Sequence, residues 1–75
     1  MTTLKQEIKK LKTGYEKIFK IDYEDEYIII RKSKLKGLEI RFYNNWEKKG
    51  TVVSYDEIRN NFTEFSLYAE AKIDY

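Results

Sequence analysis

The chain has 75 residues, of which 15 are Lys or Arg and 13 are Asp or Glu, and its net charge is +2. A chain of this length forms a single domain, here residues 1–75, and its nearly balanced charge gives no strong attraction to polyanions. The absence of cysteine excludes disulfides, thiolate metal ligands and a cysteine nucleophile, and it agrees with a cytoplasmic location.

The first predicted element is a helix over residues 3–13. Thr3 and Gln6 have the spacing of a capping box. The apolar residues of this segment recur at spacings of four and three and therefore share one helical face: Leu4, Ile8, Leu11 and Tyr15. Gly14 is expected to end the helix, because glycine readily adopts the left-handed conformation found at helix ends.

Four strands are predicted next. Alternating apolar and polar residues indicate a strand at 19–24 and another at 38–43. Between them, the apolar segment 27–31 predicts a strand that forms a hairpin with the first. A short fourth strand is expected at 51–53.

A second helix and a last strand complete the chain. Ser54 and Glu57 match a capping box, so a helix is expected to begin there, and Asn60 and Asn61 can close it. Every odd position of 64–74 holds an apolar residue or Ala, and this two-residue repeat predicts a long strand over 64–74.

These elements give the order α-β-β-β-β-α-β and an α+β fold, with a mainly antiparallel, twisted sheet and two short helices packed on one face. The residues expected on the helix-covered face are Phe19, Ile21, Ile28, Ile30, Leu38, Ile40, Phe42, Phe65, Leu67 and Ile73. Two short helices cover only one face, so the other face is expected to stay open.

Aromatic residues make up 16% of the chain, and several are expected on the open face beside two arginines. The candidate protein-binding residues there are Tyr27, Arg31, Arg41, Tyr43 and Tyr68, with Ile29 between them. Tyr and Arg dominate the hot spots of protein interfaces. The alternative is that tyrosine is simply favoured on solvent-facing strands. Trp46, in a connection, is either a lid on the core or a further anchor of this interface.

An acidic segment lies between the first two strands and contains Asp22, Glu24, Asp25 and Glu26. Carboxylates suit Mg²⁺ or Ca²⁺, but the segment lacks the glycine and the terminal glutamate of an EF-hand loop. We therefore interpret it as the solvated tip of a hairpin, and we expect no metal and no cofactor.

Two rows of lysines could contact phosphates. One row is Lys5, Lys9 and Lys12 on the first helix, and the other is Lys32, Lys34 and Lys36, which are expected on one side of an extended segment. With tyrosines stacking on unpaired bases, these rows would make a small nucleic-acid-binding module. Solvation of a helix face and protection of an edge strand are simpler explanations.

The chain has few residues suited to catalysis, since histidine and cysteine are absent and no serine has an evident activating partner. In size and composition the chain resembles small phage or mobile-element proteins that block a host protein, including anti-CRISPR inhibitors. We therefore expect a non-enzymatic inhibitor or adaptor that binds a host protein, or a homodimer formed through the same face. Nucleic-acid binding is the second choice. The longest apolar run, 27–30, is far below the ~20 residues of a membrane span, so no membrane partner is expected.

Overall fold

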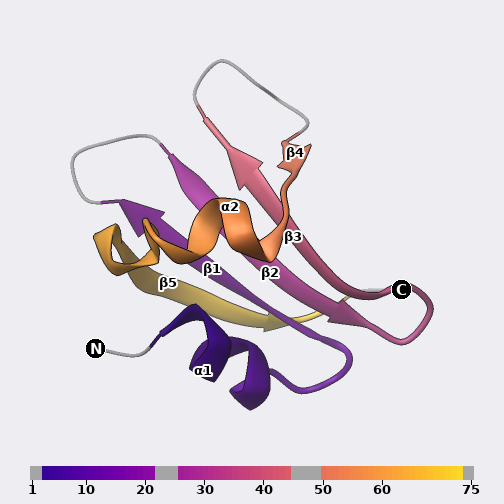
Figure 1. Cartoon of the computed structure of the whole chain (residues 1–75). Coiled ribbons are helices and arrows are strands. Elements are labelled where there is room, and N and C mark those ends of the chain that lie inside the picture. The colour runs from indigo at the N-terminus through magenta and orange to yellow at the C-terminus, as the bar shows by residue number, and fades with distance from the viewer. Residues whose placement is uncertain (1–2, 22–25, 45–49, 74–75) are drawn as a thin grey trace.

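The computed structural model describes residues 3–21, 26–44 and 50–73. In chain order the elements are α1 (Leu4–Lys10), β1 (Tyr15–Ile21), β2 (Tyr27–Ser33), β3 (Gly37–Tyr43), β4 (Thr51–Val52), α2 (Tyr55–Arg59), a 3₁₀ turn η1 (Phe62–Glu64) and β5 (Phe65–Lys72). The predicted α+β order is therefore confirmed (Figure 1).

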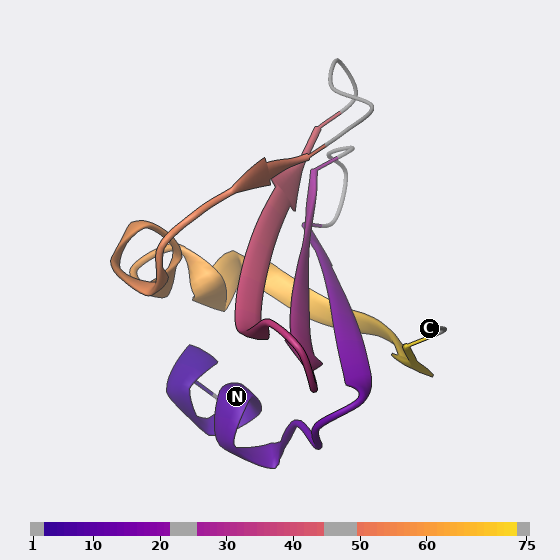
Figure 2. The same ribbon diagram turned by 90° about the vertical axis from the view of Figure 1, so that its right-hand side faces the viewer.

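The strands form one five-stranded sheet in the order β4-β3-β2-β1-β5, and every neighbouring pair is antiparallel. Strands β1 and β2 form the predicted hairpin, in which Phe19 lies opposite Ile28. Both helices lie on the same side of the twisted sheet (Figure 2). One face of the sheet, the helix face, is thus covered, whereas no helix of the described residues lies over the opposite face.

The helices begin where their capping boxes predict. The Thr3 side chain accepts from the backbone of Gln6, and the Ser54 side chain accepts from the backbone of Glu57. Helix α2 closes at Asn60, as expected. These caps satisfy backbone N–H groups that have no partner inside the helix, so the start of each helix can be predicted from a local pattern.

Helix α1 is shorter than predicted. It ends at the C-cap Leu11, where the backbone becomes extended, rather than at Gly14. Gly14, with φ of 93°, belongs instead to a turn closed by the bond from Tyr15 N–H to Lys12 O. The first strand consequently starts at Tyr15 and not at Phe19, because its early residues pair with both β2 and β5.

The core lies between the helix face and the two helices. Its buried residues are Leu4, Leu11, Phe19, Ile28, Ile30, Ile40, Ile58, Phe62 and Phe65. Phe19 and Phe62 meet edge to face, with ring centroids 5.0 Å apart, so η1 is anchored on β1. Leu38 and Leu67, expected on the covered face, stand on it by register but remain largely exposed near its edges.

The prediction that Ile73 faces the helices is wrong. The register between β1 and β5 shifts at Tyr68, since Phe19 lies opposite Leu67 while Ile18 lies opposite Ala69. This β-bulge turns the residues after it to the other face of the sheet. Ile73 is therefore buried on the face opposite the helices, although it continues the odd-numbered apolar pattern of Phe65 and Leu67.

Within residues 3–21, 26–44 and 50–73, no helix has the length and apolar character required to cross a membrane.

Candidate functional site: the open face of the sheet

The face without helices, here called the open face, brings together residues from four strands. It is formed by Glu16, Ile18 and Lys20 of β1, Tyr27, Ile29 and Arg31 of β2, Glu39, Arg41 and Tyr43 of β3, and Ala69 and Ala71 of β5, with Ile73 just beyond. The candidate residues of β2 and β3 thus share one surface. They are neither sealed in the core nor spread over unrelated sides, since Tyr27 and Tyr43 are half-buried there.

Tyr27 and Tyr43 form a stacked cross-strand pair. Their ring centroids are 4.8 Å apart and the ring planes differ by 1°. Gly50, which precedes β4, lies so close to Tyr43 that a Cβ at this position would be 2.5 Å from the tyrosine ring. Because β2 and β4 flank β3 on opposite sides, Tyr43 lies between Tyr27 and Gly50. The ring of Tyr43 is therefore packed against its own chain, and its edge and hydroxyl are what remain for a partner.

Tyr68 lies at the bulge of β5 and is the most exposed tyrosine of the described residues, at 65%. The Lys20 ammonium lies 4.2 Å from the centroid of its ring. This cation–π contact links β1 to β5 across the open face and occupies one side of the ring. Like Tyr43, Tyr68 already uses part of its ring surface within the chain.

Each arginine of the open face is paired with a carboxylate. Arg41 donates from Nε to Glu39 Oε1 at 2.6 Å, and Arg31 Nε lies 3.5 Å from Glu16 Oε2 without a hydrogen bond. The hydrogen bond from Arg41 lowers the pKa of Glu39, and the positive charges of Lys36 and Arg31 lower it further. The arginine side chains remain 43% exposed for Arg31 and 38% for Arg41, so both can contact another molecule.

A hollow of about 490 Å³ lies on this face. This open-face hollow is lined by residues that include Glu16, Ile29, Arg31, Arg41, Tyr43 and Ile73. The charged residues of this lining are three cations and two carboxylates: Arg31, Lys36 and Arg41, and Glu16 and Glu39. A hollow that combines apolar side chains with convergent polar groups is typical of a binding site, and the excess of one positive charge in this lining favours an anionic group of a ligand.

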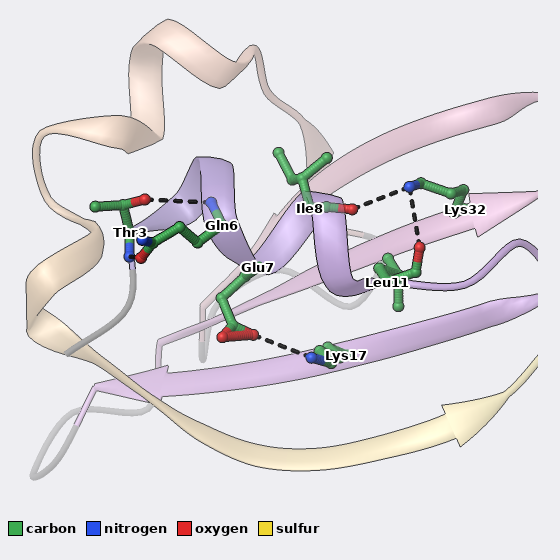
Figure 3. A network of polar contacts seen from close by, with 7 residues as sticks. All are labelled: Thr3, Gln6, Glu7, Ile8, Leu11, Lys17 and Lys32. Atoms are coloured by element: carbon green, nitrogen blue, oxygen red, sulfur yellow. Dashed lines mark hydrogen bonds and ion pairs between the residues drawn. The ribbon is translucent and has the colours of Figure 1, made fainter.

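The predicted rows of lysines are not preserved as rows. Lys32 points to the helix face, where its Nζ donates to Ile8 O at 2.9 Å and to Leu11 O at 3.0 Å (Figure 3). Strand β2 ends at Ser33, and residues 34–36 form the turn, so the expectation of one extended row with Lys34 and Lys36 is wrong. Lys32 thus stabilises the end of α1, because its ammonium lies at the carbonyls of the last turn and of the C-cap, where positive charge is favourable.

The lysines of the first helix keep their predicted exposure. Lys5 and Lys9 are exposed one turn apart on α1, and Lys12 is exposed after the helix has ended. They lie outside the open face, because α1 covers the opposite face of the sheet. Lysines on α1 and tyrosines on the open face are therefore not parts of one surface.

Two sequence predictions fall outside the described residues, namely the role of Trp46 and the environment of Asp22, Glu24 and Asp25. Of the acidic segment, the structure describes Glu26, whose carbonyl accepts from Ile21 N–H in the hairpin. Across the described parts of the chain, no three or more Asp or Glu side chains lie together in a group that could hold a metal ion.

The sequence interpretation missed several residues of the open-face hollow, among them Glu39, Glu16 and Ile73. Glu39 lies two residues before Arg41, a spacing that puts both side chains on one face of a strand, so this pair could have been found. Glu16 could not, because the strand was predicted to start after it. Ile73 could not, because the bulge that redirects it has no clear signal in the sequence.

Comparisons of the chain with protein-family models, with curated proteins and with solved structures gave no match.

Proposed function

We propose that this chain is a non-enzymatic binding protein that holds part of another protein on the open face of its sheet. The observation that supports this most directly is the open-face hollow of about 490 Å³, whose lining includes Arg31, Arg41 and Tyr43. These are the residue types that contribute most to the hot spots of protein interfaces, and hot spots lie where a pocket can exclude water.

The pairing of charges also supports a protein partner. A hydrogen bond from Nε to Glu39 orients the guanidinium of Arg41, whereas Arg31 lies 3.5 Å from Glu16 without a hydrogen bond, and both side chains stay partly exposed. A pre-oriented arginine loses less conformational entropy when it binds. The partner segment would therefore present apolar groups to Ile29 and Ile73 and an acidic side chain to the arginines.

The alternative is a nucleic-acid-binding module that stacks unpaired bases on tyrosines. Stacking needs a free ring face, whereas Tyr43 is packed between Tyr27 and Gly50, and Tyr68 carries the Lys20 ammonium. Lys32 is also committed to the end of α1. These contacts favour the protein partner over the nucleic acid.

Size and composition support a narrower form of the same proposal, in which the partner is a host protein and the chain is an inhibitor or adaptor of phage or mobile-element origin. This form places the protein in the cytosol of the host cell, where a chain without cysteine needs no oxidising environment.

The test is affinity capture from a nuclease-treated lysate of the host cell, followed by titration of the captured protein with purified variants. Arg41→Ala and Tyr68→Ala remove exposed side chains of the open face, whereas Lys9→Ala removes an exposed side chain of α1 as the matched control. We expect each open-face variant to weaken binding by about 2 kcal/mol, roughly thirtyfold, and the control to bind normally.

Equal affinity of all three variants would show that the open face is not the binding surface. Loss of all captured material after nuclease treatment, together with salt-sensitive binding of single-stranded DNA or RNA, would replace the proposal with the nucleic-acid alternative.

A further inference from the structure

Strand β5 ends the sheet on one side, and no other strand of the described residues lies along its outer edge. In the described sheet it pairs with β1 alone (Figure 1). Six of its eight residues are exposed. Backbone N–H and C=O groups on the outer side of such a strand are a template for pairing with a further strand.

A hydrogen bond at the end of β5 shows which backbone groups point outward. Ile73 N–H donates to Gly14 O at 2.7 Å, so the backbone groups of Ile73 face β1. These groups alternate sides along a strand, so those of Ala71 also face β1, while those of Glu70 and Lys72 face the free edge. The two outward-facing residues are thus a carboxylate and an ammonium, two positions apart.

The side chains of Glu70 and Lys72 lie on the same face of the sheet, because their register partners on β1, Lys17 and Tyr15, both lie on the helix face. In an antiparallel pair of two β5 strands centred on Ala71, Glu70 of each copy lies opposite Lys72 of the other. A pair centred on Glu70 or on Lys72 would put like charges opposite each other, which is unfavourable. Among the registers centred on residues 70 to 72, backbone direction and charge therefore both favour the one centred on Ala71.

We propose that this chain forms a two-fold dimer in which β5 pairs antiparallel with β5 of a second copy, centred on Ala71. Each copy contributes two outward-facing residues, Glu70 and Lys72, and two opposite-charge pairs form. The bulge at Tyr68 interrupts the regular spacing of outward groups, so regular pairing is confined to residues 69–73 and the dimer is weak.

The dimer joins two five-stranded sheets into one and leaves both open faces on the same side. A two-fold axis perpendicular to the sheet keeps paired residues on a common face, so the open faces become neighbours across β5. This inference does not depend on the proposed function, because the edge of β5 and the open-face hollow are different surfaces.

The test is sedimentation equilibrium of the full chain at concentrations up to about 1 mM, since interfaces far below ~1,200 Å² give weak complexes. Lys72→Glu and Glu70→Lys each turn both opposite-charge pairs into like-charge pairs, and each is expected to weaken the dimer roughly tenfold or more. An equimolar mixture of the two variants restores both opposite-charge pairs and should dimerise like the wild type. Lys9→Glu, the same charge change on exposed α1, is the control and should leave the dimer unchanged.

A wild type that stays monomeric at the highest concentration overturns the inference. So does a dimer that neither charge reversal weakens, since such a dimer uses another surface. Circular dichroism checks that the variants fold, because Glu70→Lys places a cation opposite Lys17. Should either variant fail to fold, hydrogen exchange of the wild type decides. Protection of the Glu70 and Lys72 amides that rises with concentration supports the pairing, and concentration-independent protection rejects it.

Discussion

The two faces of the sheet use charged residues in opposite ways. On the helix face, Lys17 Nζ lies 3.1 Å from Glu7 Oε2, and these side chains are only 10% and 9% exposed (Figure 3). On the open face, Arg41 and Glu39 form a shorter contact, but the arginine remains 38% exposed.

This difference shows that burial, more than the distance between the charged atoms, decides how much an ion pair contributes to stability. Removing water from Glu7 and Lys17 costs free energy that their mutual contact partly offsets, so the pair helps to fix how α1 sits on β1. An exposed pair contributes little to stability, because water solvates either ion nearly as well. Its arginine can therefore change partner, which suits a binding surface.

The largest expected change in the free energy of unfolding comes from an apolar residue of β2. In this strand, adjacent positions point to opposite faces of the sheet. Ile28 is fully buried on the helix face, whereas Ile29 is half-buried on the open face. We expect Ile28→Ala to lower the free energy of unfolding by about 3 kcal/mol, through lost burial and a new cavity. Ile29→Ala should cost roughly 1 kcal/mol. Urea denaturation measures both, and equal losses would contradict the assignment of the faces.

The second effect concerns the ion pairs. Lys17→Met removes the ammonium beside buried Glu7 and should destabilise the fold by about 2–3 kcal/mol, since the carboxylate then lacks that compensation. Glu7→Leu combined with Lys17→Met should recover most of this loss. Arg41→Met, the matched change on the open face, should cost less than about 1 kcal/mol. A loss for Arg41→Met as large as for Lys17→Met in the same denaturation assay would reject the comparison.

The third effect compares two glycines that both have positive φ. Gly50 has φ of 49°, and a Cβ there would collide with the Tyr43 ring, while Gly37 has φ of 72° and open space around it. Gly37→Ala should cost about 1 kcal/mol from backbone strain alone. Gly50→Ala should cost about 2 kcal/mol, because the tyrosine ring must move as well. Thermal unfolding gives the costs, and near-UV circular dichroism should show a loss of the Tyr27–Tyr43 signal only for Gly50→Ala.

The smallest expected effect is a pH dependence of the stability, which comes from Glu39 on the open face. The hydrogen bond from Arg41 lowers the pKa of Glu39 in the folded protein. The stability from this contact is therefore present above the ordinary carboxyl pKa and is lost as the pH falls through the lowered value. An NMR titration should find the pKa of Glu39 below its ordinary value in the wild type and closer to that value in Arg41→Gln, where Lys36 and Arg31 still lower it. An unchanged Glu39 titration in the variant would show that Arg41 is not the cause.

Both helix starts and the faces of β2 and β3 could be predicted from the sequence. Caps such as Thr3 and Ser54 act within four residues, and the alternation of Ile28, Ile30 and Arg31 needs only the period of a strand. The open face with its arginines and two of its tyrosines followed directly from that alternation. Local patterns were sufficient there because each residue's direction depends on its own neighbours in the chain.

Other features depended on contacts between distant segments. Ile73 turns to the open face because β5 has one residue more than β1 at the bulge, which only the pairing of the two strands reveals. Lys32 looked like a free surface lysine, yet it satisfies the end of α1, whose carbonyls accept across 21 and 24 positions of sequence.

The sequence by itself thus determined the order of elements, the caps and the faces of the regular strands, since these follow from capping, chain period and residue type. The tertiary structure decided where α1 ends, which lysines are used internally, and how Glu16, Glu39 and Ile73 join the arginines around one hollow. The physical reason is that register and burial arise between segments, and a β-strand shifted by one residue exposes the opposite set of side chains.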